Sequence, residues 1–304
     1  MPPFWLSIGA LSLLQGALVA LPGTISIPWV QRRTSRWWAA IPPLSVIVFV
    51  FVARAAEQAS AQSLTYLAVV AVPVLATLAL GWWCRGARPA LALLAPALFA
   101  LAWADRSGLA GEAAATVLSA LSCAALGVLL AAVTPPRWLA AGIVLMACAD
   151  AALVVSELLQ HPNEVLNTAH PAAGLPKLQA EVFGRAAMGY GDLFVAGLLG
   201  GLLARGWPGG RVVARVATAG VCDGGGGSSL PRLAIGRQTR AAVLVAALAL
   251  AFDLLFFFVE ELPATVPVAV GLLIVMGLAA SGRRSPTAVE NPERVTATAP
   301  EVPT

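Results

Sequence analysis

The chain alternates between long runs of hydrophobic residues and short polar segments. Nine apolar runs can be distinguished, at roughly residues 4–27, 37–55, 64–84, 88–104, 113–133, 137–159, 183–205, 240–259 and 262–280. Each run is close to the roughly 20 residues that a helix needs to cross the hydrocarbon core of a bilayer. Trp37, Trp82 and Trp138 lie at the ends of runs, as is typical of tryptophan at a membrane interface. The pattern predicts an all-α, polytopic membrane helix bundle with about nine transmembrane helices.

Composition and charge narrow the class of protein. Of 304 residues, 59% are hydrophobic and 11% are charged, whereas a soluble domain has about a quarter of its residues charged. The net charge of +4 comes from arginines at the ends of the runs and not from one patch, so no nucleic-acid partner is expected. The four cysteines form no CxxC pair, and His161 and His170 lack a third ligand. We therefore expect neither a metal nor a cofactor.

The positively charged loops orient the expected bundle. Every second loop is rich in arginine, whereas the basic residues of the other loops are offset by acids. Cytoplasmic loops carry the excess of lysine and arginine, so we expect the N-terminus outside and the C-terminus in the cytoplasm, with the protein integral to the plasma (cytoplasmic) membrane. The arginines behind this argument are Arg32, Arg33, Arg36, Arg85, Arg88, Arg137, those between 205 and 240, Arg283 and Arg284.

Three regions follow from this organisation. Residues 1–136 are expected to form an N-terminal half of five spans, and residues 137–280 to form spans six to nine. The second half includes a flexible cytoplasmic loop at about 206–239, which contains four consecutive glycines at 224–227. Residues 281–304 are rich in proline, threonine and glutamate and are expected to form a disordered cytoplasmic tail.

Asp150, Asp192 and Asp253 lie well inside apolar runs, where an acid is costly and is often functional. Asp150 lies about 9 residues before the external end of the run 137–159, and Asp192 about 9 residues after the external end of 183–205. At about 1.5 Å per residue, both lie roughly 14 Å below the same surface. Adjacent helices would then hold two carboxyl groups at one depth.

Two facing carboxyl groups suit an aspartic protease mechanism. Because both cannot easily ionise together, they share one proton. The ionised group can act as a general base on water, and the protonated group can donate to the substrate carbonyl oxygen. Gly189 and Gly191 leave room for an extended substrate beside Asp192. An interhelical hydrogen bond, or a proton or cation path that also uses Asp253, stays open at this point.

Three short motifs occur in order along the second half of the chain. Asp150 lies in the sixth run, Gly189-Tyr190-Gly191-Asp192 opens the seventh, and Pro263-Ala264-Thr265 opens the ninth. In this order they resemble the intramembrane aspartyl proteases, the presenilin and signal peptide peptidase family, with its GxGD and PAL motifs. Thr265 stands in place of the PAL leucine, and Ala149 replaces the tyrosine that usually precedes the first aspartate. The resemblance covers about residues 137–280.

The resemblance implies a nine-helix bundle that hydrolyses peptide bonds inside the transmembrane helices of other proteins. Asp150 and Asp192 would be catalytic. The inferred orientation is similar to that of signal peptide peptidase, so the partners would be transmembrane segments or signal-peptide remnants in the lipid bilayer. Assembly of the chain into a homo-oligomer is an alternative that the sequence leaves open. The residues that would contact substrate are Gly189, Tyr190, Gly191, Pro263, Ala264 and Thr265.

Prepilin peptidases are a second class of enzyme with a GxGD motif in the membrane. A lysine usually follows their motif aspartate, whereas Leu193 and Phe194 follow Asp192 here. The Pro263-Ala264 element has no role in those enzymes. An intramembrane aspartic endopeptidase is therefore the preferred hypothesis, with a prepilin-peptidase-like protease and a proton- or cation-coupled transporter as alternatives.

Overall fold

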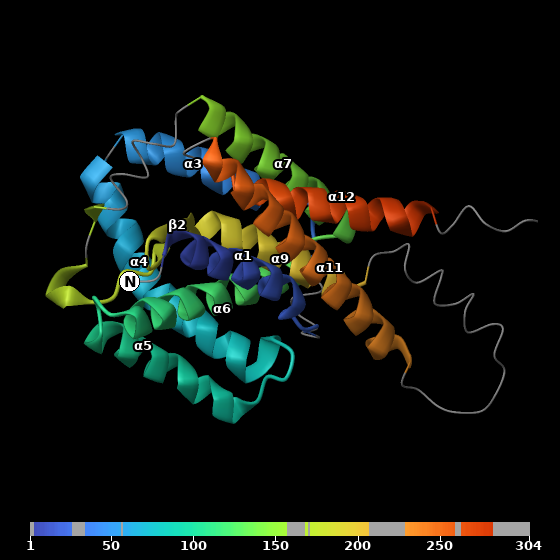
Figure 1. Ribbon diagram of the computed structural model, residues 1–304. Helices are drawn as coiled ribbons and strands as arrows, with labels where there is room; N and C mark the ends of the chain where they lie inside the picture. Colours follow the sequence, from blue (N-terminus) through green and yellow to red (C-terminus); the bar gives the residue numbers. More distant parts are fainter. Residues whose placement is uncertain are drawn as a thin grey trace, which may run out of the picture.

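The computed structural model describes residues 3–25, 34–55, 57–156, 168–169, 171–206, 229–258 and 263–281. Within these residues the protein is a bundle of helices with one short β-hairpin, which the all-α prediction did not include (Figure 1). The first half contains α1 (Phe4–Ala20), η1 (Arg36–Ala40), α3 (Ile41–Ala55), α4 (Glu57–Leu78), η2 (Ala79–Trp83), η3 (Pro89–Leu93), α5 (Leu94–Ala104) and α6 (Leu109–Val133). The second half contains α7 (Pro136–Val155), η4 (Ala172–Gly174), β1 (Ala180–Phe183), β2 (Ala186–Gly189), α9 (Tyr190–Ala204), α11 (Ser229–Asp253), η5 (Leu254–Phe257) and α12 (Thr265–Ser281).

Three helical segments are long and apolar enough to cross a membrane, namely Ala61–Trp83, Leu109–Val133 and Pro136–Val155. Shorter apolar helices in the described residues are Phe4–Ala20, Pro89–Ala104, Tyr190–Ala204 and Thr265–Leu278. Large apolar side chains are exposed on many helices, among them Leu67, Val70, Leu93, Leu145, Val243 and Leu278. Such a surface is typical of contact with lipid. All nine apolar runs contain helix, but how many of them cross a bilayer stays a prediction.

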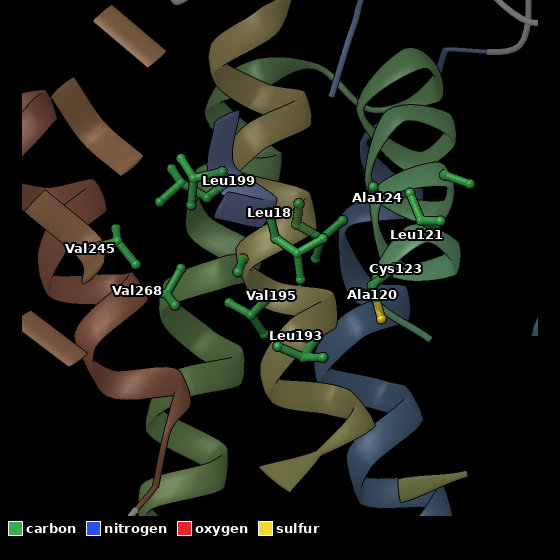
Figure 2. Packing of buried hydrophobic residues seen from close by; sticks show 14 of the residues in the cluster. Leu18, Ala120, Leu121, Cys123, Ala124, Leu193, Val195, Leu199, Val245 and Val268 are labelled. Carbon is green, nitrogen blue, oxygen red and sulfur yellow. The ribbon is translucent and has the colours of Figure 1, made fainter. Parts of the chain in front are cut away.

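Helix α9 lies in the centre of the bundle, where it packs along α6 and also contacts α1, α7, α11 and α12. Figure 2 shows Leu193, Val195 and Leu199 of α9 among buried side chains from α1, α6, α11 and α12. The α6–α9 contact is close because glycines line it. A Cβ atom on Gly201 would lie 2.5 Å from the carbonyl oxygen of Gly127, so only glycine fits there without a shift of the helices.

Two boundaries predicted from the sequence are wrong. The run 183–205 is not one span, because β1 and β2 form an antiparallel hairpin and α9 begins only at Tyr190. Gly184 allows the turn with a φ of 63°, a conformation that favours glycine at a two-residue hairpin turn. The predicted loop 206–239 is too long, because α11 begins at Ser229. The rest of this loop, at 207–228, and the tail at 282–304 lie outside the described residues.

Candidate active site

Asp192 lies in the first turn of α9, directly after the hairpin, and not nine residues inside a helix as expected. The hairpin strand β2 ends at Gly189, whose backbone N–H donates to Oδ2 of Asp192 over 3.1 Å. An acid at the third helical position makes this contact when it caps the helix. The capping bond uses one carboxyl oxygen, and Oδ1 has no hydrogen bond among the described residues.

Asp150 lies on α7 and contacts the start of α12. The hydroxyl of Thr265, the first residue of α12, donates to Oδ2 of Asp150 over 2.6 Å, and the backbone of Thr265 also hydrogen-bonds this carboxyl group. Thr265 is buried, with 1% of its surface exposed. Thr265, which stands where the resembled proteases have the leucine of their PAL motif, is therefore the residue that binds Asp150.

The carboxyl groups of Asp150 and Asp192 interact electrostatically, although no hydrogen bond joins them among the described residues. They come together because α7, α9 and α12 contact one another in pairs. The expected picture was two carboxyl groups at equal depth within two antiparallel helices. The structure instead combines an acid on the side of α7 with an acid at the N-terminal turn of α9.

The two glycines of the GxGD segment differ in their surroundings. Gly189 is exposed and extended, and a Cβ atom there would lie 3.1 Å from Oδ2 of Asp192. A Cβ atom on Gly191 would lie 3.6 Å from Cε of Met146, which is an ordinary contact. Gly189 therefore keeps space beside the carboxyl group, whereas packing in this structure does not require glycine at 191.

Helix α6 anchors the start of α9 and the hairpin, a role that the sequence analysis did not assign. The hydroxyl groups of Tyr190 and Ser122 are 2.7 Å apart and hydrogen-bonded. At the hairpin turn, the N–H of Gly184 donates to Oε2 of Glu112 over 2.7 Å. Isolated polar residues in the apolar run 113–133 and at its start were the signal for this role.

Gln15 of α1 is a further partner of the site that motif comparison missed. Its side-chain Nε2 donates to the carbonyl oxygen of Ala264 over 2.8 Å and reaches that of Asp192 at 3.5 Å. Gln15 is fully buried, with 0% of its surface exposed. One amide in an apolar run was the available signal, because such a group needs hydrogen bonds when it is buried.

Asp253 has a different partner from the other two acids. The hydroxyl of Ser12 on α1 donates to Oδ2 of Asp253 over 2.6 Å, which makes an interhelical bond between α1 and α11. Among the described residues, no hydrogen bond joins Asp253 to Asp150 or Asp192. The interhelical hydrogen bond that the sequence left open for these acids is thus present at Asp253.

Comparison with protein-family models, with curated proteins and with solved structures finds no match to this chain. The fold and the site define the class of protein by themselves. It is a helical protein with features of membrane association and with two interacting carboxyl groups at the junction of α7, α9 and α12. His161 and His170 lie outside the described residues.

Proposed function

We propose that the protein is an intramembrane aspartic endopeptidase of the plasma membrane, which cleaves transmembrane segments or signal-peptide remnants. The proposal rests on one observation: Asp150 and Asp192, from different helices, interact beside the segment Pro263-Ala264-Thr265. The hydroxyl of Thr265 donates to Asp150, and the carbonyl oxygen of Ala264 accepts from the Gln15 amide that also reaches the backbone of Asp192. A nine-span bundle with the N-terminus outside and the C-terminus in the cytoplasm is part of this proposal.

The two carboxyl groups take different roles. Asp150 accepts hydrogen bonds from both the hydroxyl and the backbone of Thr265, and donors of this kind favour the ionised form. Asp192 accepts one such bond, from Gly189, whereas Asp150 accepts two, so we assign Asp150 as the general base that removes a proton from water. Asp192 carries the shared proton and donates it to the carbonyl oxygen of the scissile peptide bond as the oxygen of water attacks the carbon.

The tetrahedral intermediate then collapses. Its carbonyl re-forms, the bond between carbon and nitrogen breaks, and the proton taken up by Asp150 passes to the departing amine. The hydroxyl proton returns to Asp192 as the new carboxylic acid forms, so the pair again holds one proton between two carboxyl groups. No cofactor or metal is required by these steps.

The remaining candidate residues divide between substrate contact and support. The exposed backbone of Gly189, next to Asp192, supports its role as a contact for an extended substrate, and we keep Gly191, Pro263 and Ala264 in the same role. Tyr190 and Thr265 were expected to contact substrate. Their hydroxyl groups are engaged by other residues, so we assign Tyr190 to anchoring α9 and Thr265 to orienting the catalytic base.

The proposal is tested by cleavage of a tagged membrane peptide in liposomes. Asp150→Asn and Asp192→Asn should abolish cleavage, because asparagine can neither accept a proton from water nor donate an acidic one. Asp253→Asn is the matched control, since it removes a third intramembrane carboxyl group with a separate partner, and it should cut like the wild type. Cleavage by Asp150→Asn or Asp192→Asn at the wild-type rate would show that the site is wrong.

The same three variants separate the protease from a coupled transporter. A transporter that uses all three acids should carry protons or cations in liposomes and lose this flux in each variant, Asp253→Asn included. The hydrogen bond from Ser12 already accounts for Asp253, which supports the protease. Ion flux without any peptide cleavage by the wild type would overturn our proposal.

A further inference from the structure

Gln15 is a fully buried amide in an apolar helix, and no step of the proposed hydrolysis uses it. Helix α1 lies outside the region of resemblance at 137–280, so no motif suggests a role for it. An amide buried without hydrogen bonds is strongly unfavourable. The partners of Gln15 therefore indicate why an amide occupies this position.

Both partners of Gln15 are backbone carbonyl groups at the site. Nε2 donates to Ala264 over 2.8 Å and lies 3.5 Å from the carbonyl oxygen of Asp192. These contacts also define the orientation of the amide, because the opposite orientation would bring Oε1 against two acceptor oxygens. Only a hydrogen-bond donor suits the space between the carbonyl oxygens of Ala264 and Asp192.

The two carbonyl groups belong to the two halves of the proposed catalytic pair. Ala264 immediately precedes Thr265, which holds Asp150, and the second carbonyl is that of Asp192 itself. A chain of contacts therefore runs from Asp150 through Thr265 and Ala264 to Gln15 and on to Asp192. This side chain of α1 connects the N-terminal ends of α9 and α12.

The other end of the amide suggests that stability is not the main role of Gln15. Its Oε1 is buried and has no hydrogen-bond partner among the described residues. A buried acceptor without a partner is destabilising, and an apolar side chain of similar shape avoids this cost. A leucine at 15 removes this unpaired acceptor together with the donor, so the gain offsets the lost hydrogen bonds and the variant should fold.

We infer that Gln15 is a positioning residue of the active site, which holds the Pro263-Ala264-Thr265 segment against the first turn of α9 and so sets the separation of the two catalytic carboxyl groups. This inference rests on the proposed function. It makes α1 a part of the active site, although α1 carries no catalytic group.

The matched control for Gln15 is Gln238 of α11, which is also fully buried. Its Nε2 donates to the carbonyl oxygens of Val19, Pro22 and Gly200 over 2.9, 3.1 and 3.1 Å. Gly200 is eight residues beyond Asp192, or about 12 Å further along α9. Gln238 thus joins α11 to α1 and α9 by donating to backbone carbonyl groups, as Gln15 joins α1 to the starts of α9 and α12, but away from the carboxyl groups. Its Oε1 also accepts a hydrogen bond from Arg85.

The experiment measures kcat, KM and the thermal unfolding temperature of Gln15→Leu and Gln238→Leu with a tagged membrane peptide in liposomes. Gln15→Leu should lower kcat about 10- to 100-fold, as small misplacements of catalytic groups do, with little change in KM or in unfolding temperature. Gln238→Leu should lower the unfolding temperature and keep kcat within about twofold of the wild type.

A second variant, Gln15→Glu, gives a readout that a purely structural role would not move. A glutamate carboxylate cannot donate a hydrogen bond, whereas the protonated acid can. The ratio of variant to wild-type kcat should therefore rise as the pH is lowered. This ratio keeps the inference testable if Gln15→Leu fails to fold.

The outcomes separate the two hypotheses. If cleavage requires Asp192 but Gln15→Leu keeps the wild-type kcat, or if the Gln15→Glu ratio is flat with pH, the inference about Gln15 is wrong and the protease stands. If both leucine variants lose kcat in proportion to the fall in their unfolding temperature, the inference is also overturned. If the wild type does not cleave, or Asp192→Asn cleaves as well as wild type, the proposed function fails and takes the inference with it.

Discussion

Replacing Thr265 by valine removes one hydroxyl group from the site and keeps the shape of the side chain. The hydroxyl donates to Oδ2 of Asp150 over 2.6 Å from a position with 1% of its surface exposed. A hydrogen bond to a charged group contributes about 1.5–3 kcal/mol. If the whole of this contribution supports the catalytic state of Asp150, kcat should fall about 10- to 150-fold.

Thr265→Ser is the control, because serine keeps the hydroxyl and should stay within about threefold of the wild type. The assay is cleavage of a tagged membrane peptide in liposomes, with the thermal unfolding of each variant measured in the same lipid. Thr265→Leu introduces the leucine that intramembrane aspartyl proteases carry in their PAL motif. If Thr265→Val or Thr265→Leu cuts as fast as wild type while Thr265→Ser is folded, the hydroxyl does not orient the base, and the motif matters for another reason.

Three other predictions follow from the geometry. The dependence of kcat/KM on pH should be bell-shaped, because the pair is active with one proton between two carboxyl groups, and a flat profile would contradict the shared proton. Gly201→Leu should lower the unfolding temperature, because a Cβ atom there would lie 2.5 Å from the Gly127 carbonyl oxygen. Gly277→Leu should not, since among the described residues a Cβ atom there would meet no atom within 4 Å beyond its own stretch of helix. Ser12→Ala should destabilise the protein by about 1–3 kcal/mol through the lost hydrogen bond to Asp253 and leave kcat unchanged. If the denaturant unfolding of Ser12→Ala equals that of the wild type, this hydrogen bond does not stabilise the contact between α1 and α11.

The helices were largely predictable because hydrophobic runs are a local property of the chain. The run 113–133 corresponds to α6 at Leu109–Val133, and the run 137–159 to α7 at Pro136–Val155. The predicted helix boundaries are wrong where an apolar segment is not helical or where a helix continues into a polar segment. Residues 183–189 are apolar enough to extend a span, but the turn at Gly184 makes them part of a hairpin. Likewise, α11 extends into a polar segment from Ser229, because a helix can continue beyond the apolar part that packs.

The candidate site was predictable in its acids and not in their partners. Asp150, Asp192 and Asp253 stand out in the sequence for one reason, the cost of an acid in an apolar run. Hydropathy treats all three alike. Packing separates them, since Ser12 binds Asp253, whereas Thr265 binds Asp150 and Gly189 binds Asp192.

The sequence alone determined that this chain is rich in apolar helices and that a few costly acids lie within them, because both follow from residue type and local spacing. Only the tertiary structure decided which acids interact and which side chains hold them. Gln15 and Ala264 are 249 residues apart in the chain and 2.8 Å apart across the helix contact. A hydrogen bond of that kind depends on how α1 packs against the N-terminal ends of α9 and α12, and such packing leaves no periodic signal in the sequence.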